Sequence, residues 1–230
     1  MISHSGLVLW KKRIPSTTYT ELDYLESTGT QWIDIGTTVD TSTDEIELCF
    51  QLTETGMYKW FFGEYDTNAR LGLGSGDGIN KRNFLYKSST AKISDTDVYN
   101  RQHKYLINAS GGFIDGVKKV GYDSFSSNST LYLFNINIDG SSDYKCKAKV
   151  WTYKQTRNGV LIRDLIPVLD KNNIPCMYDK VSGEFFYNKG TGEFLYGLKP
   201  NETDADNELI TADGLKFLTA DGNKFLVKEN

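Results

Sequence analysis

Apolar and polar residues alternate with a period of two along most of the chain. Every second residue is apolar over 45–52, and similar spacing returns over 131–138, 146–151 and 160–166. Such alternation is typical of β-strands that bury one face. No stretch of about a dozen residues shows the spacing of an amphipathic helix, in which apolar residues three and four apart share a face. The pattern therefore predicts an all-β protein.

Short turn motifs separate several of these runs. Asp115-Gly116 lies between two apolar segments, and Asn158-Gly159 comes directly before another. Asp-Gly and Asn-Gly favour tight hairpins because both central residues of the turn need a positive φ. A repeat at period nine, Gly183–Tyr187 and Gly192–Tyr196, predicts a further hairpin across 188–191. Many short strands joined by such turns are typical of a sandwich or a barrel.

The two ends of the chain differ from the middle. Residues 1–18 show no alternation and predict an N-terminal arm, whereas 19–197 form the predicted sandwich. Residues 198–230 begin as an acidic linker and continue with the pattern TADGxKFL twice, at 211–218 and 219–226. Each repeat suits a small hairpin with an Asp-Gly turn. Two such hairpins cannot bury a core alone, so we expect them to pack on the sandwich or on a partner.

Composition and charge limit the function. The 230 residues include 26 basic and 30 acidic ones, and the pI is about 5.3. Proteins that bind nucleic acids need a basic face, so we expect no nucleic-acid partner. No run of about 18 apolar residues occurs, so we expect no membrane segment. The three cysteines form no C-x-x-C pair, which predicts three buried thiols in a protein made in a reducing cytoplasm.

Two long blocks of the chain resemble proteins of tailed bacteriophages and of prophages of gut bacteria. The first block is Tyr24–Gly36, YLESTGTQWIDIG. The second is Arg163–Pro167, RDLIP, followed by Pro175–Asn188, PCMYDKVSGEFFYN. The resemblance covers roughly 20–197 and implies a two-sheet antiparallel jelly roll of the concanavalin and laminin-G-like type. It also implies a virion component, which is a fibre, a capsid decoration protein or an adhesin. A fibre of this kind would be a homotrimer.

The expected function is therefore non-enzymatic binding on a virion. Many copies on one particle make weak contacts effective through their high local concentration. The expected partners are host-surface glycans and neighbouring virion proteins, the latter reached through Leu7, Val8, Leu9 and Trp10 of the arm. This apolar stretch is too short for a signal-peptide core. The basic residues at 11–13 follow it, whereas in a signal peptide they come before the core, so we expect no signal peptide. A purely structural cement protein without a ligand is the alternative.

Aromatic side chains with polar neighbours are the candidate glycan-binding residues. Sugar rings stack their apolar faces on aromatic rings, and polar groups nearby bind the hydroxyls. Along 147–153, strict alternation places Trp151 and Tyr153 on the same face as Lys147 and Lys149. We predict that these four side chains form a ligand-binding surface.

A second alternative is a glycoside hydrolase. Glu21, Asp23 and Glu26 form the pattern E-x-D-x-x-E, which resembles the catalytic strand of laminarinase-type enzymes. Period two places the first two on one face, and a bulge would bring Glu26 to join them. Two carboxyls about 5 Å apart would support retaining hydrolysis. The motif opens the domain, whereas in those enzymes it lies mid-domain, so we interpret it as charges on an edge strand and expect no enzymatic activity.

No cofactor or metal is expected. Laminin-G-like domains often hold Ca²⁺ on a rim loop, and the candidate loops here are 75–78 and 139–143. Turn formation explains the Asp and Gly residues of both loops. His4 and His103 lie far apart and match no zinc-binding spacing.

Overall fold

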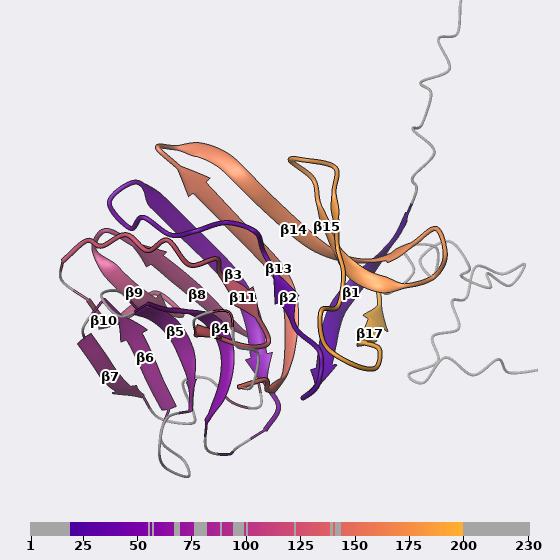
Figure 1. Ribbon diagram of the computed structural model, residues 1–230, viewed down its shortest axis with the longest axis horizontal. Coiled ribbons are helices and arrows are strands. Elements are labelled where there is room, and N and C mark those ends of the chain that lie inside the picture. Colours follow the sequence, from indigo (N-terminus) through magenta and orange to yellow (C-terminus); the bar gives the residue numbers. More distant parts are fainter. Residues whose placement is uncertain are drawn as a thin grey trace, which may run out of the picture.

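The computed structural model describes residues 19–199, apart from 55, 57, 67–69, 76–81, 88, 94–98, 100, 122, 139 and 141–143. Every regular element in this part of the chain is a β-strand (Figure 1). The described residues include no helix that could cross a membrane. The arm at 1–18, with Leu7, Val8, Leu9 and Trp10, and the repeats at 211–226 lie outside the described residues.

The strands form two sheets, both mainly antiparallel. The larger sheet has the order β10-β9-β8-β3-β13-β1-β14-β15-β16, and β17 also pairs with β1. Its strands are β1 Tyr19–Thr28, β3 Asp44–Leu52, β8 His103–Asn108, β9 Gly111–Ile114, β10 Val117–Val120, β13 Lys147–Arg157, β14 Val160–Asp170, β15 Pro175–Asp179, β16 Phe185–Phe186 and β17 Leu195–Leu198. The smaller sheet has the order β2-β11-β4-β5-β6-β7, and β12 runs parallel to β4. Its strands are β2 Ile33–Asp34, β4 Lys59–Tyr65, β5 Arg70–Ser75, β6 Arg82–Tyr86, β7 Ser89–Ile93, β11 Tyr132–Leu133 and β12 Asn137–Ile138.

The core lies between the two sheets. β3 buries every second residue, as the alternation predicts, and its Phe50 stacks on Phe61 of β4 with ring centroids 4.5 Å apart. Phe62 of β4 meets Tyr105 of β8 edge-on at 6.0 Å. Each such side chain contributes about 1.5–3 kcal/mol when it is fully buried. The fold is an all-β jelly-roll sandwich, as expected from the sequence.

Two hairpin predictions from the turn motifs are confirmed. β9 and β10 are joined by Asp115 and Gly116, whose φ angles are 49° and 78°. β13 and β14 are joined by Asn158 and Gly159, with φ angles of 51° and 74°. Positive φ at both central residues is the geometry that matches the right-handed twist of paired strands.

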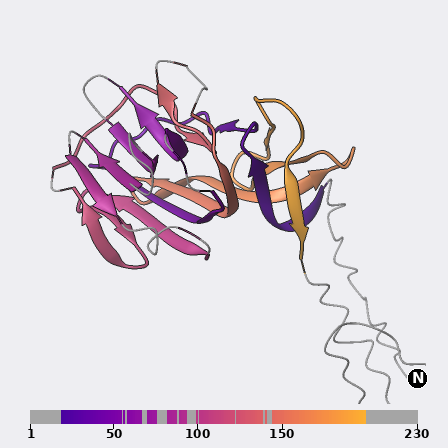
Figure 2. The same ribbon diagram turned by 90° about the horizontal axis from the view of Figure 1, so that it is seen from below.

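β1 inserts into the hairpin formed by β13 and β14. The two hairpin strands pair near their turn, between 153–157 and 160–165. Further from the turn, Leu25 of β1 pairs with Val150 of β13, and Glu21 pairs with Val168 of β14. As a result β1, β14, β15 and β17 extend beyond the sandwich at one end (Figures 1 and 2).

The hairpin predicted across 188–191 is wrong. Phe185 and Phe186 of β16 pair with β15, while β17 pairs with β1, so the two repeats do not pair with each other. The repeats stay apart because residues 188–191 hydrogen-bond to the segment at 30–32, which follows β1. The backbone N–H of Lys189 donates to Trp32 O, and that of Thr191 donates to Thr30 O.

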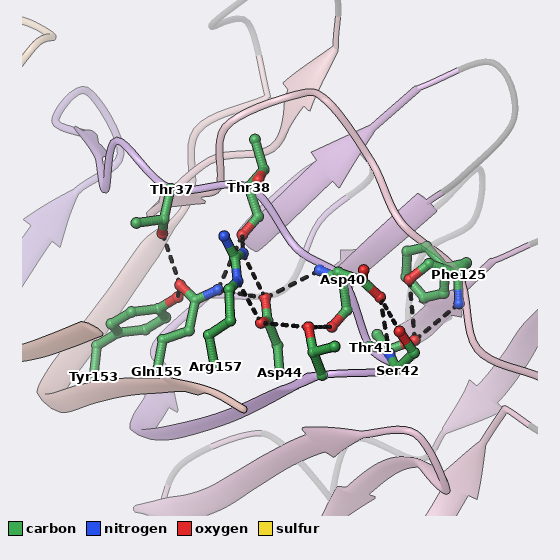
Figure 3. A network of polar contacts seen from close by, with 11 residues as sticks. Thr37, Thr38, Asp40, Thr41, Ser42, Asp44, Phe125, Tyr153, Gln155 and Arg157 are labelled. Atoms are coloured by element: carbon green, nitrogen blue, oxygen red, sulfur yellow. Dashed lines mark hydrogen bonds and ion pairs between the residues drawn. The ribbon is translucent and has the colours of Figure 1, made fainter. Parts of the chain in front are cut away.

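A buried polar network fastens the 37–44 segment to β13 (Figure 3). Asp44 is 4% exposed and accepts hydrogen bonds from Arg157 Nε and Nη2 at 2.7 and 2.8 Å. Gln155 Nε2 also donates to Asp44, at 2.8 Å. Burial alone would raise the pKa of Asp44, but the hydrogen bonds from Arg157, the Asp40 backbone and Gln155 outweigh it and hold the pKa below its usual value.

Candidate functional site

A β-bulge in β13 decides which side chains reach the outer face of the larger sheet. Val150 pairs with Phe50 and Thr152 pairs with Cys49, so Trp151 is an extra residue with no partner in β3. Ala148 and Val150 point into the core, while Trp151 and Thr152 are both half-buried on the outer face. The extra residue shifts the alternation by one position for the rest of the strand.

The bulge makes one of our four ligand-binding assignments wrong. Tyr153 is completely buried and does not share the outer face with Trp151. Its hydroxyl donates to Gln155 Oε1 at 2.9 Å, and its ring lies 6.1 Å from that of Phe62. Tyr153 is therefore a core residue, because strict alternation fails at the bulge.

A second bulge shapes the outer face of β1. The register with β17 shifts between Leu22 and Tyr24. Leu22 and Leu25 are buried, and Glu21, Asp23, Tyr24 and Glu26 lie on the opposite, outer side. β1 therefore contains a bulge of the kind that the glycoside-hydrolase alternative requires.

The outer faces of β1 and β13 together form an aromatic platform, which consists of Tyr24, Trp151 and Lys149. The rings of Tyr24 and Trp151 lie 5.5 Å apart at an angle of 55°. The ammonium of Lys149 lies 4.1 Å from the centroid of the Tyr24 ring, a cation–π contact. Both aromatic side chains are half-buried, so part of each ring reaches solvent.

A glycine of β17 permits the position of Tyr24. Tyr24 pairs with Gly197, and a Cβ atom at that glycine would lie only 2.4 Å from Tyr24 Cε1. The aromatic ring therefore lies directly against the backbone of β17. A side chain at residue 197 would displace the ring and disturb the platform.

Carboxylates border the platform. Trp151 Nε1 donates to Asp23 Oδ2 at 3.4 Å, and Lys149 Nζ lies 3.6 Å from Glu26 Oε2. Glu21, further along β1, forms an ion pair with Lys199. Glu21 and Glu26 are thus each paired with a different lysine, Lys199 and Lys149.

A hollow adjoins the platform on the other side of β13. It has a volume of about 490 Å³ and crosses the outer faces of β3, β8 and β13. Its polar lining includes Glu45, Glu47, Lys104, Thr152 and Lys154. Thr152 follows Trp151 in the chain and lies on the same outer face, so the hollow lies next to the aromatic platform.

Two sets of sequence predictions remain. Lys147, at the start of β13, alternates onto the same outer face as Lys149 and Trp151, as predicted, and its backbone N–H donates to Glu54 Oε1 at 2.6 Å. The loop residues 76–78, 139 and 141–143, which were considered for Ca²⁺, lie outside the described residues. Among the residues that are described, no three His, Cys, Asp or Glu side chains are arranged to hold a metal ion.

The cysteines only partly match the expectation of three buried thiols. All three are free thiols; Cys146 and Cys176 are buried, but Cys49 is half-buried and lines the hollow. Burial nevertheless raises the pKa of Cys49, so its thiol stays protonated at neutral pH.

Comparison with known proteins supports the fold. No protein-family model matches the chain, and no curated protein matches it. Solved structures do match, and one of them is the crystal structure of a candidate carbohydrate-binding protein from Bacteroides ovatus ATCC 8483. The two share 13% identity with a TM-score of 0.54 over 78% of this chain and 61% of that protein. This chain therefore spans less than two thirds of its structural neighbour.

Sequence reasoning missed Tyr24 as a member of the site. Tyr24 and Trp151 come from strands more than a hundred residues apart, and only the pairing of Leu25 with Val150 brings them together. The sequence around Asp23 and Tyr24 does contain a signal for the bulge that places Tyr24 on the outer face. Two successive polar or amphipathic residues between Leu22 and Leu25 indicate a bulge, because unbroken alternation would place one leucine on the outer face.

Proposed function

We propose that this protein binds carbohydrate without cleaving it, through the platform of Tyr24, Trp151 and Lys149 and the adjoining hollow. The observation that carries the proposal is the half-buried Trp151, packed beside Tyr24, next to a hollow bordered by charged side chains. An aromatic ring offers a surface for the apolar face of a sugar, and the carboxylates and lysines around it offer partners for hydroxyls. The carbohydrate-binding description of the structural neighbour agrees with this ligand class.

We further propose that the protein acts as a component of a tailed-phage particle. The support is the resemblance of the blocks at 24–36 and 163–188 to phage and prophage proteins. The expected partners remain other virion proteins, contacted through the arm, and glycans of the host surface. Multivalent display would make a shallow open platform sufficient, because many weak contacts add up on one particle.

The charges around the platform support binding over hydrolysis. Asp23, Glu26 and Glu21 each contact a different partner, namely Trp151, Lys149 and Lys199. A glycosidase needs two carboxyls facing one scissile bond, and this arrangement instead distributes them along the strand. If purified protein cleaves a polysaccharide and Glu26→Gln abolishes the cleavage, the hydrolase alternative holds.

The test is a glycan array probed with purified wild-type protein and two variants. Trp151→Ala removes the exposed ring, and we expect an affinity loss of about tenfold or more for the bound glycan. Tyr153→Phe is the matched control, because it changes an aromatic residue of the same strand that faces the core. Equal binding by wild type and Trp151→Ala would contradict the proposal. Wild-type protein that binds no glycan would favour the cement-protein alternative.

A further inference from the structure

A second cleft opens where the two resemblance blocks meet. It has a volume of about 540 Å³ and is lined by Asp34 and Gly36 on one side and by Glu184–Tyr187 and Lys189 on the other. The two sides are about 150 residues apart in the sequence. The cleft shares no residue with the aromatic platform.

The walls of this cleft are firmly held. Gln31 Nε2 donates to Glu193 O at 2.9 Å, and the backbone N–H of Lys189 donates to Trp32 O at 2.9 Å. These bonds fasten the 188–193 segment to the chain around β2. A cleft with fixed walls loses little conformational entropy when a ligand enters.

Arg163, behind one wall of the cleft, is held by an ion pair with a buried carboxylate. Arg163 Nη1 lies 3.2 Å from Asp179 Oδ2, and Asp179 is completely buried. The guanidinium of Arg163 also lies 5.3 Å from the centroid of the Phe186 ring, which lines the cleft. Gly36 faces the Arg163 guanidinium and the Phe186 ring. Its φ of 72° is a backbone conformation that favours glycine.

A chain of aromatic contacts leads from the lining of the cleft to Tyr19. Tyr187 is 40% exposed and lies 6.2 Å from Phe185 at an angle of 27°. Phe185 in turn contacts Tyr178 at 5.0 Å, and Tyr178 contacts Tyr19 at 4.4 Å. The Tyr187 hydroxyl donates to Asp170 Oδ2 at 3.1 Å, which fixes the orientation of the exposed ring. Such a row of rings matches successive sugar units of a chain.

The charges of the lining select the kind of sugar. Asp34 and Glu184 contribute two carboxylates and Lys189 contributes one ammonium group, so the lining carries one net negative charge. This charge favours a neutral pyranose over a uronic or sialic acid, because hydroxyls of the pyranose can donate to the carboxylates and accept from the lysine.

We infer that this cleft is a second carbohydrate site, which binds neutral pyranose units of a glycan chain on Tyr187 and Phe185. The inference shares its ligand class with the proposed function but not its location. Two sites on one copy would allow a single glycan or two strands of a polysaccharide to be held at two points, which increases avidity.

The test uses the full-length protein on a panel of neutral glucans, mannans and galactans, with polyuronates and polysialic acid as acidic comparators. Tyr187→Ala should weaken binding of a neutral glycan by about tenfold or more. Tyr187→Phe retains the ring and should stay within about threefold of wild type. Lys189→Ala provides a second variant at an exposed position and should weaken the same glycan. Thermal melting of each variant verifies folding.

The outcomes separate this inference from the proposed function. If Tyr187→Ala weakens binding and Trp151→Ala does not, the cleft is a site and the platform is not. If Trp151→Ala abolishes binding while Tyr187→Ala and Lys189→Ala match wild type, the inference is overturned and the platform stands. Binding restricted to the acidic polymers would also overturn the inference. If wild-type protein binds nothing on the panel, both fail.

Discussion

Glu64 gives the protein a pH-dependent stability that a single substitution should remove. The side chain is completely buried at β4, and Ser127 Oγ donates to Glu64 Oε2 at 2.6 Å. Burial raises the pKa of Glu64 to about 7 despite this hydrogen bond, from an ordinary value of 4.5. The folded state therefore prefers the protonated acid, and the unfolded state ionises at lower pH.

The size of the effect follows from the two pKa values. The folded pKa is the higher one, so stability is greatest below about pH 4.5 and decreases as the pH rises from 4.5 to 7. Each pH unit in this window costs about 1.36 kcal/mol, which gives a loss of about 3 kcal/mol by pH 8. Glu64→Gln stays neutral and can still accept the Ser127 hydrogen bond. The stability of Glu64→Gln relative to wild type should therefore be about 3 kcal/mol greater at pH 8 than at pH 4.

Urea unfolding followed by tryptophan fluorescence at pH 4, 6 and 8 measures this difference. Comparing variant with wild type at each pH cancels the titration of all other groups. Glu47→Gln, at an exposed position on the outer face of β3, is the matched control and should show a constant difference. If the Glu64→Gln difference stays constant within about 0.5 kcal/mol between pH 4 and pH 8, the reasoning is refuted.

Two further substitutions test the framework. Gly63→Ala should prevent folding, because φ is 134° there and a Cβ atom would lie 2.0 Å from Leu71 O. Gly159→Ala is the control, because nothing lies near its Cβ, and it should lower the free energy of unfolding by only about 1–2 kcal/mol, as measured by thermal or urea unfolding. Asp44→Asn should destabilise the fold by about 2–4 kcal/mol, since it leaves Arg157 without its anion; an unchanged urea midpoint would show that the network contributes nothing.

Local patterns in the sequence were sufficient for several strands, such as β3, and for two tight turns. Alternation predicted β3 correctly because one of its faces packs on the core and the other meets solvent. The Asp115-Gly116 and Asn158-Gly159 turns were predictable because their backbone conformation depends on two residues only. The alternation over 131–138, by contrast, does not form one strand. Phe134 has a φ of 63° and separates β11 from β12, and nothing in its immediate neighbours indicates this.

The sites depend on long-range pairing and were therefore harder to predict. Lys149 and Trp151 reach the outer face as expected, but the bulge at Trp151 buries Tyr153, and the pairing of β1 with β13 places Tyr24 beside the indole. The cleft at Tyr187 was not foreseen, because one of its walls comes from the chain around β2. Pattern alone identified the aromatic residues, but not which of them would meet.

Fluorine NMR of protein labelled with 5-fluorotryptophan tests carbohydrate binding at the platform most directly. The sequence has four tryptophans, so few resonances need assignment, and Trp151→Phe identifies the one that matters. Trp60, which is 8% exposed and lies away from the platform on β4, serves as the internal reference. During titration with a glycan that the protein retains, the Trp151 resonance should shift in a saturable manner while the Trp60 resonance stays in place. A Trp151 resonance that does not move at saturating glycan would contradict the account.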